Sequence, residues 1–351
     1  MLNEETLKKI NFFLYKKKHL IIYTIIGFLS LIFEILIRRF LSIYFNDFFL
    51  HFSVIFGVAF AFYFNIKLNF SVPKIYLKKS LIYFFLISIS SYLFQYLIGK
   101  KIKFDNLNFE ESRIIISGLF FLIAYFFHIK FSFRDSRKVG VAIYANGYED
   151  IKKIFNKIGP YPDFIHVDIV DKTMNKNASD TNLSKLEVVK AYWPNHSIET
   201  HIMSEDPLTL IENNIIDWSD IIYIHHEILN REAVIRKILE KNKTPGLVLH
   251  SINEYENLEN VLKGFKEVLI LSIKKPGYSG QEFNLDSLEL IKRINSLKIR
   301  NELNICVDGG VKGNLLNKFI SEKIVSGSEV LNNQNPIRKI MQLQTVARYE
   351  K

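Results

Sequence analysis

The sequence contains almost no cysteine. Cys306 is its one cysteine in 351 residues, which excludes an intramolecular disulfide and leaves nothing in favour of an oxidising compartment. A cleavage site of small residues is also missing after the first long apolar run, where Arg38 and Arg39 follow instead, so we do not expect a cleaved signal peptide. A nucleic-acid-binding module is absent as well. The net charge of +10 therefore does not indicate a nucleic-acid partner, because many Lys and Arg residues flank apolar runs, as in membrane proteins.

Phenylalanine, in contrast, is abundant, and its distribution is uneven. Most of the 30 Phe residues lie before residue 135, where charged residues fall mainly between apolar runs. After residue 138 the composition is that of an ordinary soluble protein, and the length is sufficient for two domains. We therefore predict a membrane domain over residues 1–135 and a soluble domain over residues 139–351, joined near residues 134–140.

Four apolar segments can be drawn in the first domain, at about residues 20–37, 48–66, 80–98 and 114–131. Each has about 18 residues or more, near the length that crosses a hydrocarbon core of about 30 Å at 1.5 Å per residue. The pattern predicts an all-α transmembrane four-helix domain.

Basic residues predict the orientation of this domain in the membrane. They cluster before the first segment, between the second and third, and after the fourth, whereas Lys100, Lys101 and Lys103 oppose the pattern. The positive-inside rule then places the N-terminus and the soluble domain in the cytoplasm, on a multi-pass protein of the inner membrane.

The second and fourth segments end in similar sequences. "FNIKLNF" covers residues 64–70 and "FHIKFSF" covers residues 127–133. Two hairpins with one closing signature suggest a duplicated two-helix unit, as transporters often show. Chance and the usual interfacial aromatic and Lys anchors explain the same similarity.

Residues 15–135 resemble the GtrA-like family, small four-helix membrane proteins whose helices end in Asn-x-Lys-x-x-Phe-type motifs. Asn65, Lys67 and Phe70 match that motif in the first copy, and in the second copy His128 replaces the Asn while Lys130 keeps the Lys. The resemblance implies that this domain moves polyprenyl-phosphate-linked sugars across the membrane for cell-surface glycans, so that its partner is a membrane lipid.

Two polar residues lie within the apolar segments. Glu34 is in the first segment, and Gln95 is near the end of the third. An ionisable group in a span is costly and is a functional candidate by default. Glu34 is also close to the end of its segment, so an interfacial carboxylate explains it equally well.

The second domain alternates short apolar runs with amphipathic stretches. Eight runs, from "VGVAIYA" to "KIVSGSEV", are separated by stretches such as "YEDIKKIFNKI" and "LDSLELIKRINSL". This order predicts an α/β fold, a (β/α)8 TIM barrel. In such barrels the chemistry lies at the C-terminal ends of the strands.

Four metal-binding side chains follow from that expectation. "FIHVDIV" places His166 and Asp168 two residues apart, on one face of the second strand, and His201 and Asp308 end the third and seventh strands. A capped strand end explains any one of them alone. Two imidazoles and two carboxylates at one barrel mouth suit a divalent cation such as Zn, Fe, Mn or Co.

Three glycine-rich turns follow strands six, seven and eight. Barrels often bind phosphate through backbone N–H groups near strands seven and eight, where glycine lets the backbone approach closely, although plain turn chemistry explains each turn alone. The phosphate and substrate candidates are Met203, Gly277, Tyr278, Ser279, Gly280, Gly309, Gly310, Gly327 and Ser328.

From residue 139 onward the chain resembles ribulose-phosphate 3-epimerase. The motifs that carry the resemblance are "HVDIVDK", "ETHIM", "HHE", "KPGYSGQ" and "VDGGV". The resemblance implies that His166, Asp168, His201 and Asp308 hold the metal and that Asp168 and Asp308 are the two acid/base groups. Epimerisation beside a ketone needs a proton removed from one face and another delivered to the opposite face, which two carboxylates can perform.

This sequence departs from the family at several positions near the site. Ala142 stands where the family has Ser, Val170 where it has Met, and Lys172 where it has Gly. One interpretation is a membrane-tethered epimerase of a phosphorylated ketose or related sugar phosphate, serving cell-surface glycan synthesis. The alternative is a catalytically weak barrel that acts as a sugar-phosphate sensor on a flippase. A homo-oligomer is also compatible with the sequence.

Overall fold

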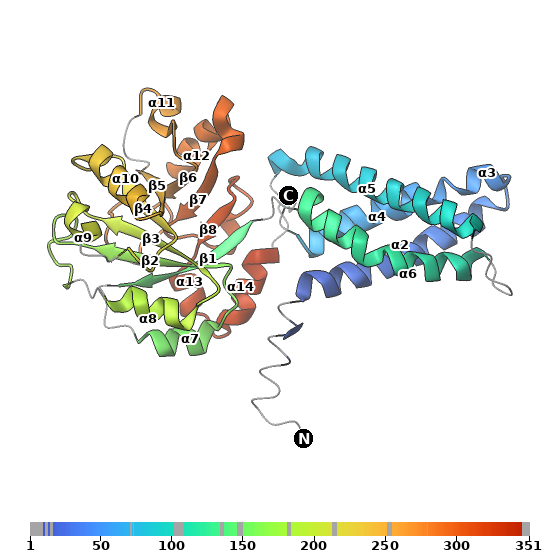
Figure 1. Cartoon of the computed structure of the whole chain (residues 1–351), viewed down its shortest axis with the longest axis horizontal. Helices are drawn as coiled ribbons and strands as arrows, with labels where there is room; N and C mark the ends of the chain where they lie inside the picture. Colours follow the sequence, from blue (N-terminus) through green and yellow to red (C-terminus); the bar gives the residue numbers. More distant parts are fainter. Residues whose placement is uncertain are drawn as a thin grey trace, which may run out of the picture. The chain divides into compact units, whose positions relative to one another are not determined.

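A computed structural model describes residues 10, 13–14, 17–70, 72, 74–101, 109–133, 137–145, 150–180, 184–212, 216–250, 255–278 and 280–345 (Figure 1). The chain divides into two compact units, a helical unit assigned to Met1–Ser136 and Thr345–Lys351 and a barrel unit, Arg137–Gln344. Part of the predicted junction, residues 134–136, lies outside the described residues.

Apolar helices make up the first unit, and α2 packs against α4 as α5 packs against α6. Helix α6 continues into a five-residue π-helix, a conformation that often marks a functional site. The elements are α2 (Lys18–Leu41), α3 (Asp47–Leu50), α4 (Ser53–Leu68), α5 (Lys74–Lys101), α6 (Phe109–Phe127) and the π-helix η1 (His128–Ser132).

Two of these helices are long and apolar enough to cross a membrane, α2 and the Tyr76–Ile98 part of α5. The structure divides the predicted span 48–66 between α3 and α4, which a short turn separates, and the span stays a prediction. The 16 residues of α4 extend only about 24 Å at 1.5 Å per residue. In the fourth segment the described apolar stretch, Phe120–Ser132, is also short. The four-span domain therefore stays a prediction.

The repeated sequence at the ends of α4 and η1 has a structural counterpart. Asn69 donates its Nδ2 hydrogen to Asn65 Oδ1 (3.0 Å), and at the matching positions His128 Nδ1 lies 3.1 Å from Ser132 Oγ. The final residues of the two copies, Phe70 and Phe133, stack with ring centroids 4.2 Å apart and planes at 9°. Both hairpins therefore close at the same end of the unit, which supports the interpretation as a duplication.

The second unit is a closed barrel of eight parallel strands in the order β1 to β8, which confirms the predicted (β/α)8 architecture (Figure 1). The strands are β1 (Lys138–Tyr144), β2 (Phe164–Val170), β3 (Ser197–Met203), β4 (Ile221–His225), β5 (Thr244–His250), β6 (Glu267–Leu271), β7 (Asn304–Asp308) and β8 (Lys323–Val325). The helices of this unit are α7 (Ile151–Ile158), α8 (Ser184–Tyr192), α9 (Leu208–Glu212), α10 (Arg231–Glu240), α11 (Leu258–Leu262), α12 (Ser287–Asn295), α13 (Ser328–Leu331) and α14 (Pro336–Thr345), with 3-10 turns η2 (Lys298–Glu302) and η3 (Gly313–Leu315).

Buried charged residues fill the N-terminal end of the barrel interior. Lys323 Nζ lies 2.7 Å from a carboxylate oxygen of both Glu199 and Glu267. Tyr223 donates its hydroxyl hydrogen to Glu199 (3.1 Å), and Asn304 donates to the other oxygen of Glu267 (2.8 Å). We call these five residues the lower cluster. It forms the floor beneath the barrel mouth, since the Tyr223 ring centroid is 6.1 Å from that of His166.

Candidate active site

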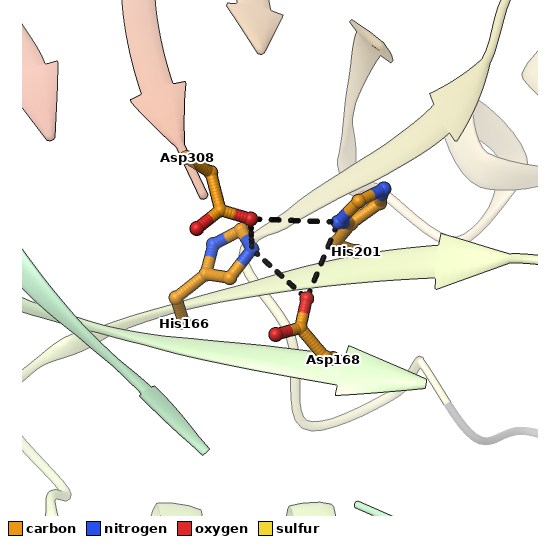
Figure 2. Close-up of side chains that lie close together, drawn as sticks. All are labelled: His166, Asp168, His201 and Asp308. Carbon is orange, nitrogen blue, oxygen red and sulfur yellow. Dashed lines mark ion pairs between the residues drawn. The ribbon is translucent and has the colours of Figure 1, made fainter. Parts of the chain in front are cut away.

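Three strands bring the four predicted metal ligands together at the barrel mouth. Residues two apart on β2 share a face, so His166 and Asp168 both point into the barrel. The parallel register places Asp168 beside His201 of β3, and Asp308 ends β7. Both imidazoles are fully buried, whereas the carboxylates of Asp168 and Asp308 keep 18% and 12% of their surface exposed. We call this group the upper cluster (Figure 2).

Each side chain of the upper cluster directs one nitrogen or oxygen toward a common point. His166 Nε2 lies 3.4 Å from Asp168 Oδ1 and 3.7 Å from Asp308 Oδ2. His201 Nδ1 lies 3.2 Å from Asp168 Oδ1 and 3.9 Å from Asp308 Oδ2. All four atoms are within 4.8 Å of one another. Ligands that share one cation at about 2.0–2.2 Å are themselves roughly 3–4 Å apart, so the spacing suits a divalent metal.

Hydrogen bonding within the upper cluster points to the same conclusion. His166 Nε2, Asp168 Oδ1 and His201 Nδ1 are buried and form no hydrogen bond of standard geometry. Leaving such atoms unpaired costs free energy, and native proteins rarely tolerate it. A cation bound by these atoms would offset that cost. The side chains therefore fit the metal, although they do not select among Zn, Fe, Mn and Co.

The surroundings shift the pKa values of the two carboxyl groups in opposite directions. Burial, together with the neighbouring negative charge of Asp168, raises the pKa of Asp308 to about 7. Burial also acts to raise the pKa of Asp168, but its interactions with His166 and His201 outweigh this effect and hold the value below the usual range. In the metal-free protein the two carboxyl groups therefore differ in their affinity for a proton.

A cavity of about 140 Å³ opens beside Asp168 and Asp308. Every described substrate candidate lines it: Met203, Gly277, Tyr278, Gly280, Gly309, Gly310, Gly327 and Ser328. Ser279 lies outside the described residues. Gly310 has φ = 63°, and a Cβ there would collide with the backbone of Phe283, so only glycine fits. The turns therefore bring backbone to the cavity, and their role as phosphate ligands stays a prediction.

The cavity wall also includes residues that were not among the sequence candidates. Tyr144 of β1 lines it, in register with Asp168, and Gln281 lines it from the turn after β6. Strand alternation could have identified Tyr144, because it is two residues from Ala142 and shares its face. Ala142 and Val170, where the sequence departs from the family, line the cavity as well. Lys172 does not, and its exposed ammonium pairs with Asp180 at 2.7 Å.

The helical unit contains a separate cavity, of about 400 Å³, that combines apolar walls with buried polar groups. Glu34, Asn65, Gln95 and His128 all line it. Gly57 makes room for the Glu34 side chain, since a Cβ at that position would lie 3.1 Å from Glu34 Cβ. The structure thus gathers three of the five membrane-domain candidates. The other two, Lys67 and Lys130, are exposed and lie over aromatic rings instead.

Comparison with known proteins supports the assignment of the barrel. The model of the ribulose-phosphate 3 epimerase family matches residues 139–331. Ribulose-phosphate 3-epimerase from Encephalitozoon cuniculi is 24% identical over 148 residues, which are 42% of this chain and 65% of that protein. The enzymes of the same name from Buchnera aphidicola and Aquifex aeolicus are 29% and 27% identical, over 52% and 48% of this chain and 82% and 74% of their own lengths.

The matched region contains all eight strands, the upper cluster and the glycine-rich turns. It begins after the helical unit, so the family model does not extend to the apolar helices. More than half of the sequence is covered by the family model, and on that basis the chain belongs to the ribulose-phosphate 3 epimerase family, a family of carbohydrate epimerases.

Proposed function

We propose that the barrel is a metal-dependent epimerase of a phosphorylated ketose or a related sugar phosphate. The observation that carries this proposal is the position of Asp168 and Asp308 beside His166 and His201 at the mouth of one barrel, where one nitrogen or oxygen of each side chain lies within 4.8 Å of the others. One carboxylate removes the proton from the carbon beside the ketone, and the other carboxyl group delivers a proton to the opposite face. In the reverse reaction the two groups exchange roles.

The residues around the carboxyl pair support this chemistry. A divalent cation held by His166, Asp168, His201 and Asp308 would neutralise the negative charge that develops on the enediolate. Gly309, Gly310 and the other turn residues present backbone to the same cavity, where they would bind the phosphate. Phosphate binding is remote from the reacting carbon, so it holds the sugar in register for proton transfer.

The direct test is turnover by the full-length protein. We would supply the metal-free chain with each candidate cation and follow epimerisation of ketose phosphates in a coupled assay. Metal-dependent turnover that Asp168→Asn and Asp308→Asn abolish supports the proposal. Substrate binding without turnover, whatever the cation, would contradict it and identify the barrel as a sugar-phosphate sensor.

For the helical unit we propose a location in the inner membrane and a role in moving a polyprenyl-phosphate-linked sugar. The apolar α2 and α5, the duplicated hairpin and the polar-lined cavity support this role, because transport proteins often bind their cargo between repeated units. In the sequence, five residues (133–137) separate η1 from β1. The barrel would then supply an uncommon sugar to a glycan pathway at the cytoplasmic membrane surface.

Two experiments test the membrane role. A reporter active only in the cytoplasm, fused after Lys351, should be active, whereas activity of a periplasm-only reporter would contradict the topology. The barrel should also fail to restore wild-type growth to a strain that lacks its ordinary ribulose-phosphate epimerase, and deleting the gene should change the surface glycan. Full rescue together with an unchanged glycan would refute the proposed pathway.

A further inference from the structure

His201 has a partner on the side that faces away from the upper cluster. Its Nε2 lies 3.0 Å from Nε2 of His225, the last residue of β4. The two ring planes are inclined by only 17° with centroids 5.1 Å apart, as expected for an edge-to-edge hydrogen bond between nearly coplanar rings. On its other side, His225 Nδ1 lies 3.3 Å from Glu227 Oε1. A line of hydrogen bonds thus runs from the upper cluster to a side chain that is 43% exposed.

The carboxylate at the outer end sets the direction of every bond in this line. Glu227 can only accept, so His225 Nδ1 carries the hydrogen and its Nε2 is left with a lone pair. That lone pair accepts the hydrogen on His201 Nε2. In the neutral imidazole, His201 Nδ1, which lies 3.2 Å from Asp168 Oδ1, then carries no hydrogen. The nitrogen that faces the upper cluster therefore presents a lone pair.

A lone pair that faces two carboxylates is unfavourable unless a cation lies between them. The tautomer that His225 and Glu227 impose on His201 is therefore the one that a metal ligand requires. We propose that His225 and Glu227 are positioning residues, which fix the tautomer and ring orientation of His201 and so strengthen metal binding. This inference rests on the proposed metal site of the epimerase, and it adds two residues with no direct contact to the metal.

The experiment measures Co²⁺ or Zn²⁺ affinity of the metal-free full-length chain by calorimetry. Glu227→Ala leaves His225 free to adopt either tautomer, and we expect the affinity to fall about 10- to 100-fold, as is typical when such a partner is removed. Because Glu227 is partly exposed, this variant should fold. The matched control, Glu232→Ala on the exposed surface of α10, should bind as the wild type does.

A second pair of variants separates positioning from general packing. His225→Phe removes the acceptor of the His201 hydrogen and should weaken metal binding to a similar extent, whereas His225→Gln keeps an acceptor oxygen and should recover much of the affinity. Saturating metal should restore turnover in Glu227→Ala, because the carboxyl pair is untouched.

The outcomes distinguish the two proposals. Metal binding that His166→Ala abolishes but that Glu227→Ala and His225→Phe leave unchanged would overturn the positioning role and leave the proposed function standing. A wild-type chain that binds neither cation would refute the metal site and the positioning role together.

Discussion

Both ends of the barrel interior contain buried charged side chains, but the two groups differ in whether their polar atoms are paired. In the lower cluster, Lys323 contacts two carboxylates, and Tyr223 and Asn304 donate to the same acids. In the upper cluster, buried atoms of His166, Asp168 and His201 have no hydrogen-bond partner. Proteins rarely tolerate unpaired buried polar atoms, so their concentration at one end marks the functional end of the barrel.

The pKa shifts express the same contrast. Burial alone would lower the pKa of Lys323, but the charges of Glu199 and Glu267 more than compensate and raise it above the usual range. The charged groups of the lower cluster are therefore paired with one another. In the upper cluster the pKa of Asp308 is raised to about 7, because its surroundings disfavour its charge. The lower cluster should thus serve stability, and the upper cluster chemistry.

The largest effect should come from Asp308→Asn in the upper cluster. It removes one proton carrier and weakens the metal site, so turnover should fall by several orders of magnitude, of which proton transfer alone accounts for about 100- to 10,000-fold. The free energy of unfolding of the metal-free protein should not decrease, since the variant removes an unfavourable buried charge. Chemical denaturation and a coupled assay measure both quantities. Near-normal turnover would refute the assignment of Asp308.

Lys323→Met tests the lower cluster and should show the opposite profile. It leaves Glu199 and Glu267 buried without a counter-charge, which typically costs about 3–5 kcal/mol of unfolding free energy. Turnover per folded molecule should stay close to the wild-type value. Lys318→Met, at an exposed position, is the control and should unfold as the wild type does. A stable Lys323→Met variant with impaired turnover would reverse the comparison between the two clusters.

The upper cluster could be predicted from the sequence, whereas the lower cluster could not. His166, Asp168, His201 and Asp308 occupy the ends of apolar strands, and parallel strands in a barrel end at one mouth. The structure brings all four together, although their role as metal ligands stays a prediction.

Glu199, Glu267 and Lys323 lie instead near the starts of strands that are far apart in the chain. Their contacts depend on the closure of the barrel, in which β8 pairs with both β7 and β1. In the sequence, three charged residues near separate apolar runs do not indicate that their side chains are in contact.

The helical unit shows a different limit of prediction from the sequence. Hydropathy registers apolar content and predicted residues 48–66 as one span, whereas helix boundaries such as the turn between α3 and α4 depend on local backbone geometry. The repeated motif was more informative. Its residues occupy matching positions in the structure, with Asn65 and His128 at one cavity and Phe70 stacked on Phe133.

Metal removal should lower the free energy of unfolding by an intermediate amount, and it should act through the upper cluster alone. A ligand that binds the folded state alone stabilises it by about 2.7 kcal/mol at 100 times its dissociation constant. Chelation should therefore lower the midpoint of thermal unfolding of the wild type and of Lys323→Met alike. Asp308→Asn should respond less, because it lacks one ligand. An equal response in Asp308→Asn, measured by calorimetry across metal concentrations, would place the bound metal outside the upper cluster.

The smallest effect should come from Ala142→Ser, which restores the hydroxyl of the related family at the wall of the cavity beside Asp168 and Asp308. Ala142 lines that cavity beside Asp168 and Tyr144, so the added oxygen would face the substrate. One neutral hydrogen bond contributes about 0.5–1.5 kcal/mol, so kcat/KM for a ketopentose phosphate should rise about tenfold or less, with stability unchanged. Ala145→Ser, whose residue does not line the cavity, is the matched control. If Ala142→Ser instead lowers kcat/KM for every ketose phosphate, then the alanine is not an adaptation to a different sugar, and the added hydroxyl does not bind the substrate.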